Sequence, residues 1–144
     1  MKLQKYLIAA ALTVAVLLPT MTAAKKSQAP QRVYMFGFAA SFTDSLAFQT
    51  EIQAVDSVWL LPNGFLVDRA LYSLQLQYYV EGKGSTNSTA TVFFAEKAYK
   101  LKKVWEKVRK RYAKADGVSL TIVPQTDFQF RPEQYNEPTI DESE

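Results

Sequence analysis

The chain has 144 residues, a formal net charge of +3, and neither histidine nor cysteine. A protein without these residues lacks the commonest general base, the thiolate nucleophile and the usual zinc ligands. Composition therefore excludes a Ser-His-Asp triad, a Cys-His pair and any disulfide, and we predict no catalytic residue, no metal and no cofactor.

The first 24 residues have the pattern of a secretory signal peptide. Lys2 and Lys5 form a positive head, an apolar run extends from Tyr6 to Leu18, and small residues close the segment at Ala24. The apolar run is too short to span a bilayer, which takes about 20 residues. We expect cleavage after residue 24, export to the periplasm or the cell exterior, and no transmembrane segment in the mature chain.

Cleavage would leave 120 residues, enough for one domain. It would also remove two of the 17 basic residues, which leaves 15 against 14 acidic ones and no strong overall field. Residues 25–32 are polar and include a proline, so we predict a flexible leader before the folded part.

The first folded segments have the patterns of strands. Residues 33–42 (VYMFGFAASF) are apolar at both alternating sets of positions, which predicts a central strand covered on both faces. Residues 43–45 form a turn, and residues 46–53 alternate as the half-buried partner of a hairpin. Residues 55–61 continue as an apolar segment after a bend near Asp56 and Ser57.

Two helices are predicted in the second half of the chain. The first begins at Asp68 as its N-cap and ends before Gly82, with Leu71, Leu74, Tyr78 and Tyr79 as its apolar stripe. The second extends over residues 97–115. Its apolar stripe consists of Ala98, Leu101, Val104, Trp105, Val108 and Tyr112.

Strands are predicted on both sides of the second helix, at residues 90–95 and 118–123, and a short edge piece at residues 128–130. The element order is β-β-α-β-α-β, and a right-handed crossover should make the strands at Val92 and Leu120 parallel. We predict a single α+β or α/β two-layer domain over residues 33–131, a mixed four-stranded sheet with two helices on one face. Residues 132–144 are acidic, and we predict a disordered tail there.

The second helix carries most of the basic residues of the chain. One interpretation is a binding surface for an anionic envelope lipid or glycan, and the other is a solvated face whose lysine stems shield the helix. The candidate binding residues are Lys100, Lys103, Lys107, Lys110 and Lys114. Nucleic acid is not expected as a partner, because no aromatic side chains interleave with these residues.

The doubly apolar first strand suggests a covered second sheet face, provided by a protein partner or by a second copy in a homodimer. The candidate interface residues are Tyr34, Phe36, Phe38 and Phe42. A third interpretation is a carboxylate-dependent hydrolase centred on Asp56, because glycosidases need two carboxyl groups held about 5 to 9 Å apart. Asp44, Glu51 and Asp68 are the other carboxylates in that half of the chain.

Two segments, FGFAASFTDSLAFQTEIQAVDSVWL and GFLVDRALYSLQLQYYV, together with the lysine-rich helix, resemble small exported proteins of unknown function from Bacteroidales-type bacteria. The resemblance covers about residues 33–131 and implies an envelope-associated single domain, with no activity or residue role to transfer. From the residues themselves we predict a non-catalytic periplasmic or secreted interaction module. The alternatives are an anion binder acting through helix 97–114 and, third, the hydrolase.

Overall fold

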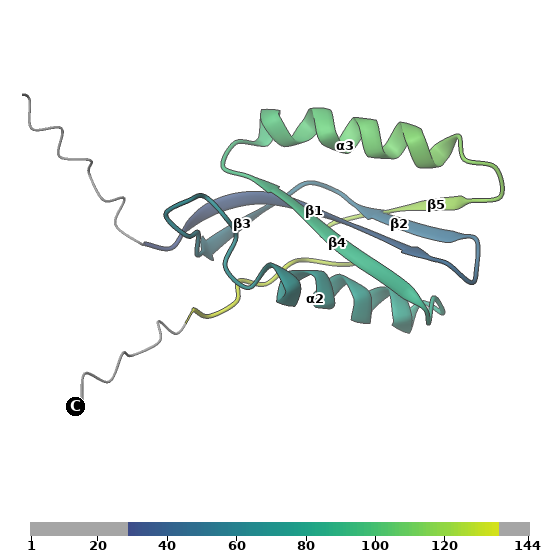
Figure 1. The fold of residues 1–144 in the computed structure, drawn as a ribbon, viewed down its shortest axis with the longest axis horizontal. Coiled ribbons are helices and arrows are strands. Elements are labelled where there is room, and N and C mark those ends of the chain that lie inside the picture. Colours follow the sequence, from purple (N-terminus) through teal and green to yellow (C-terminus); the bar gives the residue numbers. More distant parts are fainter. Residues whose placement is uncertain (1–28, 136–144) are drawn as a thin grey trace, which may run out of the picture.

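A computed structural model of the protein describes residues 29–135. The predicted signal peptide, residues 1–24, lies outside the described residues. The fold is an open mixed sheet with two helices, an α+β arrangement as the sequence predicts (Figure 1). Its elements are β1 (Gln31–Ser41), β2 (Leu46–Thr50), β3 (Gln53–Val58), α2 (Arg69–Gly82), β4 (Ser88–Ala95), α3 (Ala98–Ala113) and β5 (Ser119–Val123).

β1 is the central strand, because it pairs on both of its edges. β4 lies antiparallel along one edge, from Tyr34↔Ala95 to Ser41↔Ser88. On the other edge β3 pairs with the first half of β1 and β2 with the second half. β2 and β3 therefore occupy one position in the sheet, so the five strands fill four positions, close to the four strands predicted.

β5 pairs parallel with β2 and forms the far edge of the sheet. β2 and β4 both lie antiparallel to β1, so β4 and β5 point the same way. This confirms the parallel orientation predicted for the strands at Val92 and Leu120. The two strands are not neighbours, however, because β1 and β2 lie between them.

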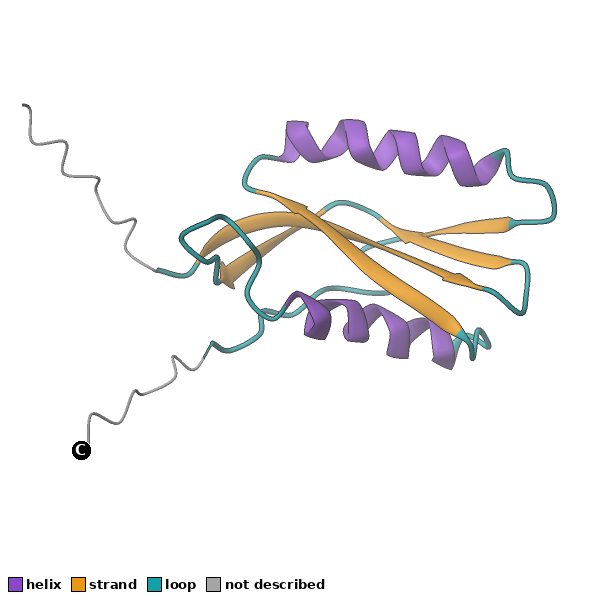
Figure 2. Cartoon of the chain, in the orientation of Figure 1, coloured by secondary structure: helices purple, strands orange, loops and turns teal. Residues whose placement is uncertain are grey.

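The helices lie on opposite faces of the sheet, so the prediction that both cover one face is wrong (Figure 2). Gly37 of β1 faces Leu76 of α2, whereas the next residue, Phe38, packs its ring against Tyr112 of α3. α2 connects β3 to β4 and α3 connects β4 back to β5, so the two crossovers run in opposite directions across the sheet. Crossovers of one hand that run in opposite directions place their helices on opposite faces.

α2 buries a different stripe from the one predicted. Tyr72, Leu76 and Val80 are buried, whereas Leu71 and Tyr78 are 43% and 66% exposed. Both stripes are apolar, so periodicity alone could not decide which one faces the sheet. Asp68 occupies the N-cap position of α2, as predicted, but its φ of 54° is left-handed and its side chain makes no capping bond.

The chain after β5 crosses the α2 face of the sheet in an extended form, which we call the C-terminal strap (residues 124–135) (Figure 1). Phe128 and Phe130 are buried in the core, but no strand forms there, so the predicted edge strand is wrong. The side-chain amide of Gln53 replaces the missing strand partner, since it donates to Phe128 O at 2.8 Å and accepts from Phe130 N at 2.9 Å.

The predicted domain boundaries shift slightly at both ends. β1 begins at Gln31, so the last two residues of the predicted leader belong to the sheet. Disorder after Pro132 is a wrong prediction for residues 132–135, because Glu133 N donates to the Tyr72 hydroxyl at 3.0 Å and Tyr135 packs against Trp59. The rest of the predicted tail lies outside the described residues.

Candidate functional site

α3 is attached to the sheet at the middle of the helix. Trp105 Nε1 donates to Thr50 O at 2.8 Å, and Gln49 Nε2 donates to Trp105 O at 2.9 Å. Within α3 only Leu101 is fully buried; Trp105, Val108 and Tyr112 of the same stripe are half-buried, and Ala98 and Val104 are exposed. The predicted stripe thus does face the sheet, but it packs loosely and leaves space on the β4 side.

That space is a hollow of about 320 Å³ between α3 and strands β1 and β4, which we call the basic groove. Its residues come from three elements that the fold brings together: Phe38 from β1, Thr91 and Phe93 from β4, and Val104, Lys107, Val108, Arg111 and Tyr112 from α3. The Phe38 and Tyr112 rings lie 4.3 Å apart at one end of the groove. Phe93 stacks at 4.8 Å on the fully buried Phe36.

The basic groove combines an apolar interior with two cations. Lys107 and Arg111 are one helical turn apart, so both side chains leave α3 on the same side. Both are exposed, and Val104 beside them is 37% exposed. Arg109, in contrast, lies over the Trp105 ring at 5.8 Å and pairs with Glu106 at 3.1 Å. The cations of α3 therefore differ in what they contact, and Lys107 and Arg111 face the hollow.

All five predicted lysine ligands are exposed: four lie on α3 and Lys114 directly follows it, and their spacing of three and four residues places them along one side of the helix. Lys107 is the only one of the five that lines the basic groove. Lys100 instead lines a separate hollow of about 380 Å³, near the loop at residues 60–64. Sequence reasoning missed Arg111, although its position four residues after Lys107 was a usable signal.

The predicted interface residues of β1 separate into two groups. Phe36 is fully buried and Phe38 nearly so, both beneath the chain's own α3, which corrects the idea that this strand face needs a partner to cover it. Tyr34 is half-buried. Phe42 is 92% exposed and lines a second hollow of about 330 Å³, which shares Phe38 and Tyr112 with the basic groove.

The carboxylates have separate structural roles. Asp56 is exposed and paired with Arg32 at 2.6 Å, and the hydrogen bond from Arg32 lowers the pKa of this carboxyl. Asp44 accepts from Leu46 N at 2.8 Å in the hairpin turn. Glu51 accepts from Gln125 N at 3.0 Å. A carboxylate held ionised by an arginine is a poor general acid, so this arrangement does not favour the hydrolase.

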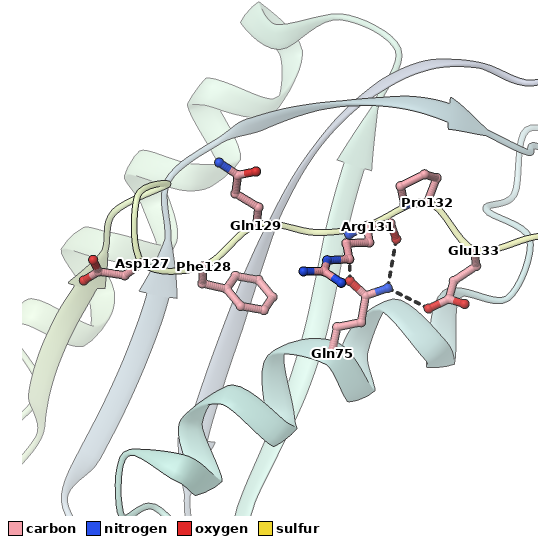
Figure 3. Close-up of a pocket in the computed structure, with 7 residues that line it drawn as sticks. All are labelled: Gln75, Asp127, Phe128, Gln129, Arg131, Pro132 and Glu133. Carbon is pink, nitrogen blue, oxygen red and sulfur yellow. Dashed lines mark hydrogen bonds between the residues drawn. The ribbon is translucent and has the colours of Figure 1, made fainter.

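A further hollow, of about 550 Å³, lies between α2 and the C-terminal strap (Figure 3). Gln75 projects from α2 into it and holds the strap, because its amide donates to Arg131 O at 2.9 Å and accepts from Arg131 N at 2.9 Å. Gln75 Nε2 also donates to Glu133 Oε1 at 2.6 Å. Gln75 therefore clamps the strap to α2 through the backbone of Arg131 and the carboxylate of Glu133.

Within residues 29–135, no group of three or more acidic residues is placed to hold a metal ion. Neither helix of this described part combines the length and apolar character needed to cross a membrane. Comparison of the chain with protein-family models, curated proteins and solved structures finds no match. The resemblance to small exported proteins of Bacteroidales-type bacteria stays a prediction.

Proposed function

We propose that the protein is a non-catalytic binding module whose ligand is an amphipathic anion bound in the basic groove. The observation that carries this proposal is the pairing of an apolar hollow with Lys107 and Arg111 at its rim. An alkyl chain would lie against Phe38, Phe93 and Val108, and its anionic group would bind the two cations.

The size and chemistry of the groove support this ligand class. Small-molecule sites occupy about 300 to 1,000 Å³ and combine apolar walls with few polar groups. The basic groove, at about 320 Å³, lies at the small end of that range and admits one short alkyl chain. A glycan would leave the apolar walls without a partner, so the proposal favours a lipid-like anion over the acidic glycan that the lysines alone would accept.

Export fits the same ligand class. If residues 1–24 direct the chain across the inner membrane, it meets the phosphate-bearing lipids of the envelope. The remaining lysines of the stripe, Lys100, Lys103, Lys110 and Lys114, would then strengthen attraction to an anionic surface without contacting the alkyl chain.

Isothermal titration calorimetry with decyl phosphate, below its micelle concentration, tests the proposal. Decyl glucoside serves as the neutral probe and inorganic phosphate as the chain-free one. We expect decyl phosphate to bind best, because only it satisfies both the apolar interior and the cations. The double variant K107E/R111E should weaken its binding at least about tenfold.

The matched control is K83E/K102E, which makes the same change in net charge at two exposed lysines that do not line the groove. It should bind decyl phosphate within about twofold of the unmodified protein. An equal loss of decyl phosphate affinity in both double variants would mean that only the overall charge matters, which would contradict a site at Lys107 and Arg111. Equal affinity for decyl phosphate and decyl glucoside would remove the role of the cations and refute the proposal.

A second candidate function is a protein-interaction module, favoured by Phe42. A phenylalanine that is 92% exposed at the tip of a hairpin, beside an apolar hollow, is typical of an anchor residue in an interface. Phe42→Ser would abolish capture of such a partner and leave decyl phosphate binding unchanged. Loss of decyl phosphate binding in Phe42→Ser would instead assign this residue to the lipid-like ligand.

A further inference from the structure

β4 is an edge strand of the sheet, and of the four residues on its outer edge Ala90 and Phe94 are half-buried while Ser88 and Val92 are buried by the chain itself. Its inner edge pairs with β1 over its whole length, and no strand in residues 29–135 pairs with its outer edge. The sequence of this 8-residue strand, STATVFFA, contains no charged residue and no proline. Natural proteins usually protect an edge strand with charges, prolines or bulges, because its free backbone groups can pair with another strand.

Two contacts establish which backbone groups of β4 point outward. Val92 lies opposite Gly37 in the ladder. Gly37 N donates away from β4, to Thr50 Oγ1 at 2.9 Å, and Val92 O accepts from Arg69 Nε at 3.0 Å. Neither group therefore bonds across the β1–β4 ladder. Because outward and inward residues alternate along an antiparallel strand, the outward ones are Ser88, Ala90, Val92 and Phe94.

We propose that the partner for this edge is a second copy of the chain, paired antiparallel through β4 with the two-fold axis at Thr91. In that register Ala90 lies opposite Val92 and Ser88 opposite Phe94. All four outward residues then exchange their N–H and C=O groups with the second copy. Two copies of β4 can pair in this way because each outward N–H meets a C=O of the other copy and no like charges come together.

This pairing also enlarges the basic groove, a consequence that rests on the proposed function. The two-fold axis of such a strand pair is perpendicular to the sheet, so α3 of both copies would lie on the same side of one continuous sheet. Thr91 and Phe93 form part of the groove and belong to β4, so the second copy would continue the floor. Lys107 and Arg111 of each copy would line the two sides of the joined groove.

Arg69 restrains this pairing. Its guanidinium donates to Val92 O through both Nε and a terminal nitrogen and lies over the Phe94 ring at 5.7 Å. A second copy needs that carbonyl, so Arg69 must release it before the strands pair. A charge-assisted contact of this kind is stronger than an ordinary backbone hydrogen bond. Removing it should therefore tighten the dimer by about tenfold.

Sedimentation velocity over a wide range of protein concentration measures the association. We expect a reversible monomer–dimer equilibrium, a dissociation constant about tenfold lower for Arg69→Met, and a monomer for Ala90→Pro at every concentration. Proline removes only the outward N–H of Ala90, which the β1 ladder does not use. Ala90→Ser is the control, because it keeps the N–H and should dimerise like the unmodified protein.

Amide hydrogen exchange by NMR tests the same pairing without any variant. The amides of Ala90 and Phe94, which are half-buried in a single copy, should become protected as protein concentration rises, whereas those of Thr89, Thr91 and Phe93 should be protected throughout. Outward amides that exchange fast at every concentration would refute the pairing. So would a dimer that Ala90→Pro leaves intact, because it would use another surface.

The two proposals fail separately. A concentration-dependent dimer that does not bind decyl phosphate would keep the β4 interface and refute the ligand. Decyl phosphate binding by a strict monomer would keep the ligand and refute the second copy.

Discussion

Gly37 lies where the sheet, α2 and the C-terminal strap meet, and it is the position at which one added methyl group should do most damage. A Cβ at Gly37 would lie 2.5 Å from Leu76 Cδ2 and 3.0 Å from Phe130 Cζ. Non-bonded carbons prefer about 3.5 to 4.0 Å. Leu76 is fully buried and Phe130 nearly so, which leaves neither side chain free to move away.

Overpacking of this kind costs about 1 to 3 kcal/mol in the free energy of unfolding. Gly37→Ala should therefore lower the melting temperature by roughly 4 to 8 °C for each kcal/mol, measured by circular dichroism. The matched control is Gly82→Ala at the end of α2, where an added Cβ would meet nothing within 4 Å. That variant should be neutral or stabilising by about 0.4 to 1 kcal/mol.

A double-mutant cycle identifies the clash itself. Leu76→Ala alone should cost about 2 to 5 kcal/mol, because it leaves a cavity in the core. In the Gly37→Ala background, Leu76→Ala should cost at least about 1 kcal/mol less than it does alone, because the new methyl group partly fills the cavity and the clash is gone. Strictly additive effects, or a Gly37→Ala protein as stable as the control, would refute the close packing at this position.

Four further outcomes follow from individual contacts. Replacing Gln53 by Ala should destabilise the protein by about 1 to 3 kcal/mol in urea titration, because it leaves two buried backbone groups of the strap unpaired; an unchanged midpoint would show that the strap is held by packing alone. The pKa of Asp56 is lowered in the folded protein, so its pairing with Arg32 stabilises the protein above pH 3.8. This stabilisation is lost as the pH falls through the lower, folded-state pKa. The unmodified protein should therefore be more stable than Asp56→Asn at neutral pH but not in acid. Burial raises the pKa of Tyr72 above 10.0, so stability should fall relative to Tyr72→Phe as the pH rises beyond that value, and parallel pH profiles of the two proteins would contradict this. Trp105→Phe should lower the melting temperature, because it removes the hydrogen bond from Trp105 to the sheet. An unchanged melting temperature would mean that only the apolar stripe holds α3.

Much of the secondary structure could be predicted because its determinants are local. The alternation at residues 46–53 and the helical period at residues 98–112 place strand and helix where the structure has them. The candidate site was only partly predictable. Lys107 was found from the run of basic residues, but Phe93 and Thr91 belong to the groove only because β4 lies beside β1 under the C-terminal half of α3.

The amino-acid sequence by itself determined that this is an α+β domain with no cysteine or histidine, and that its first strand is apolar on both sides. The tertiary structure decided which element covers which face. Two crossovers in opposite directions put α2 and α3 on opposite sides of β1, so the chain covers its own central strand. In residues 29–135 β4 and β5 are the edge strands of the sheet, and the sequence of β4 differs little from that of a buried strand. Exposure of an edge depends on strand order, and strand order follows from long-range pairing that no local pattern encodes.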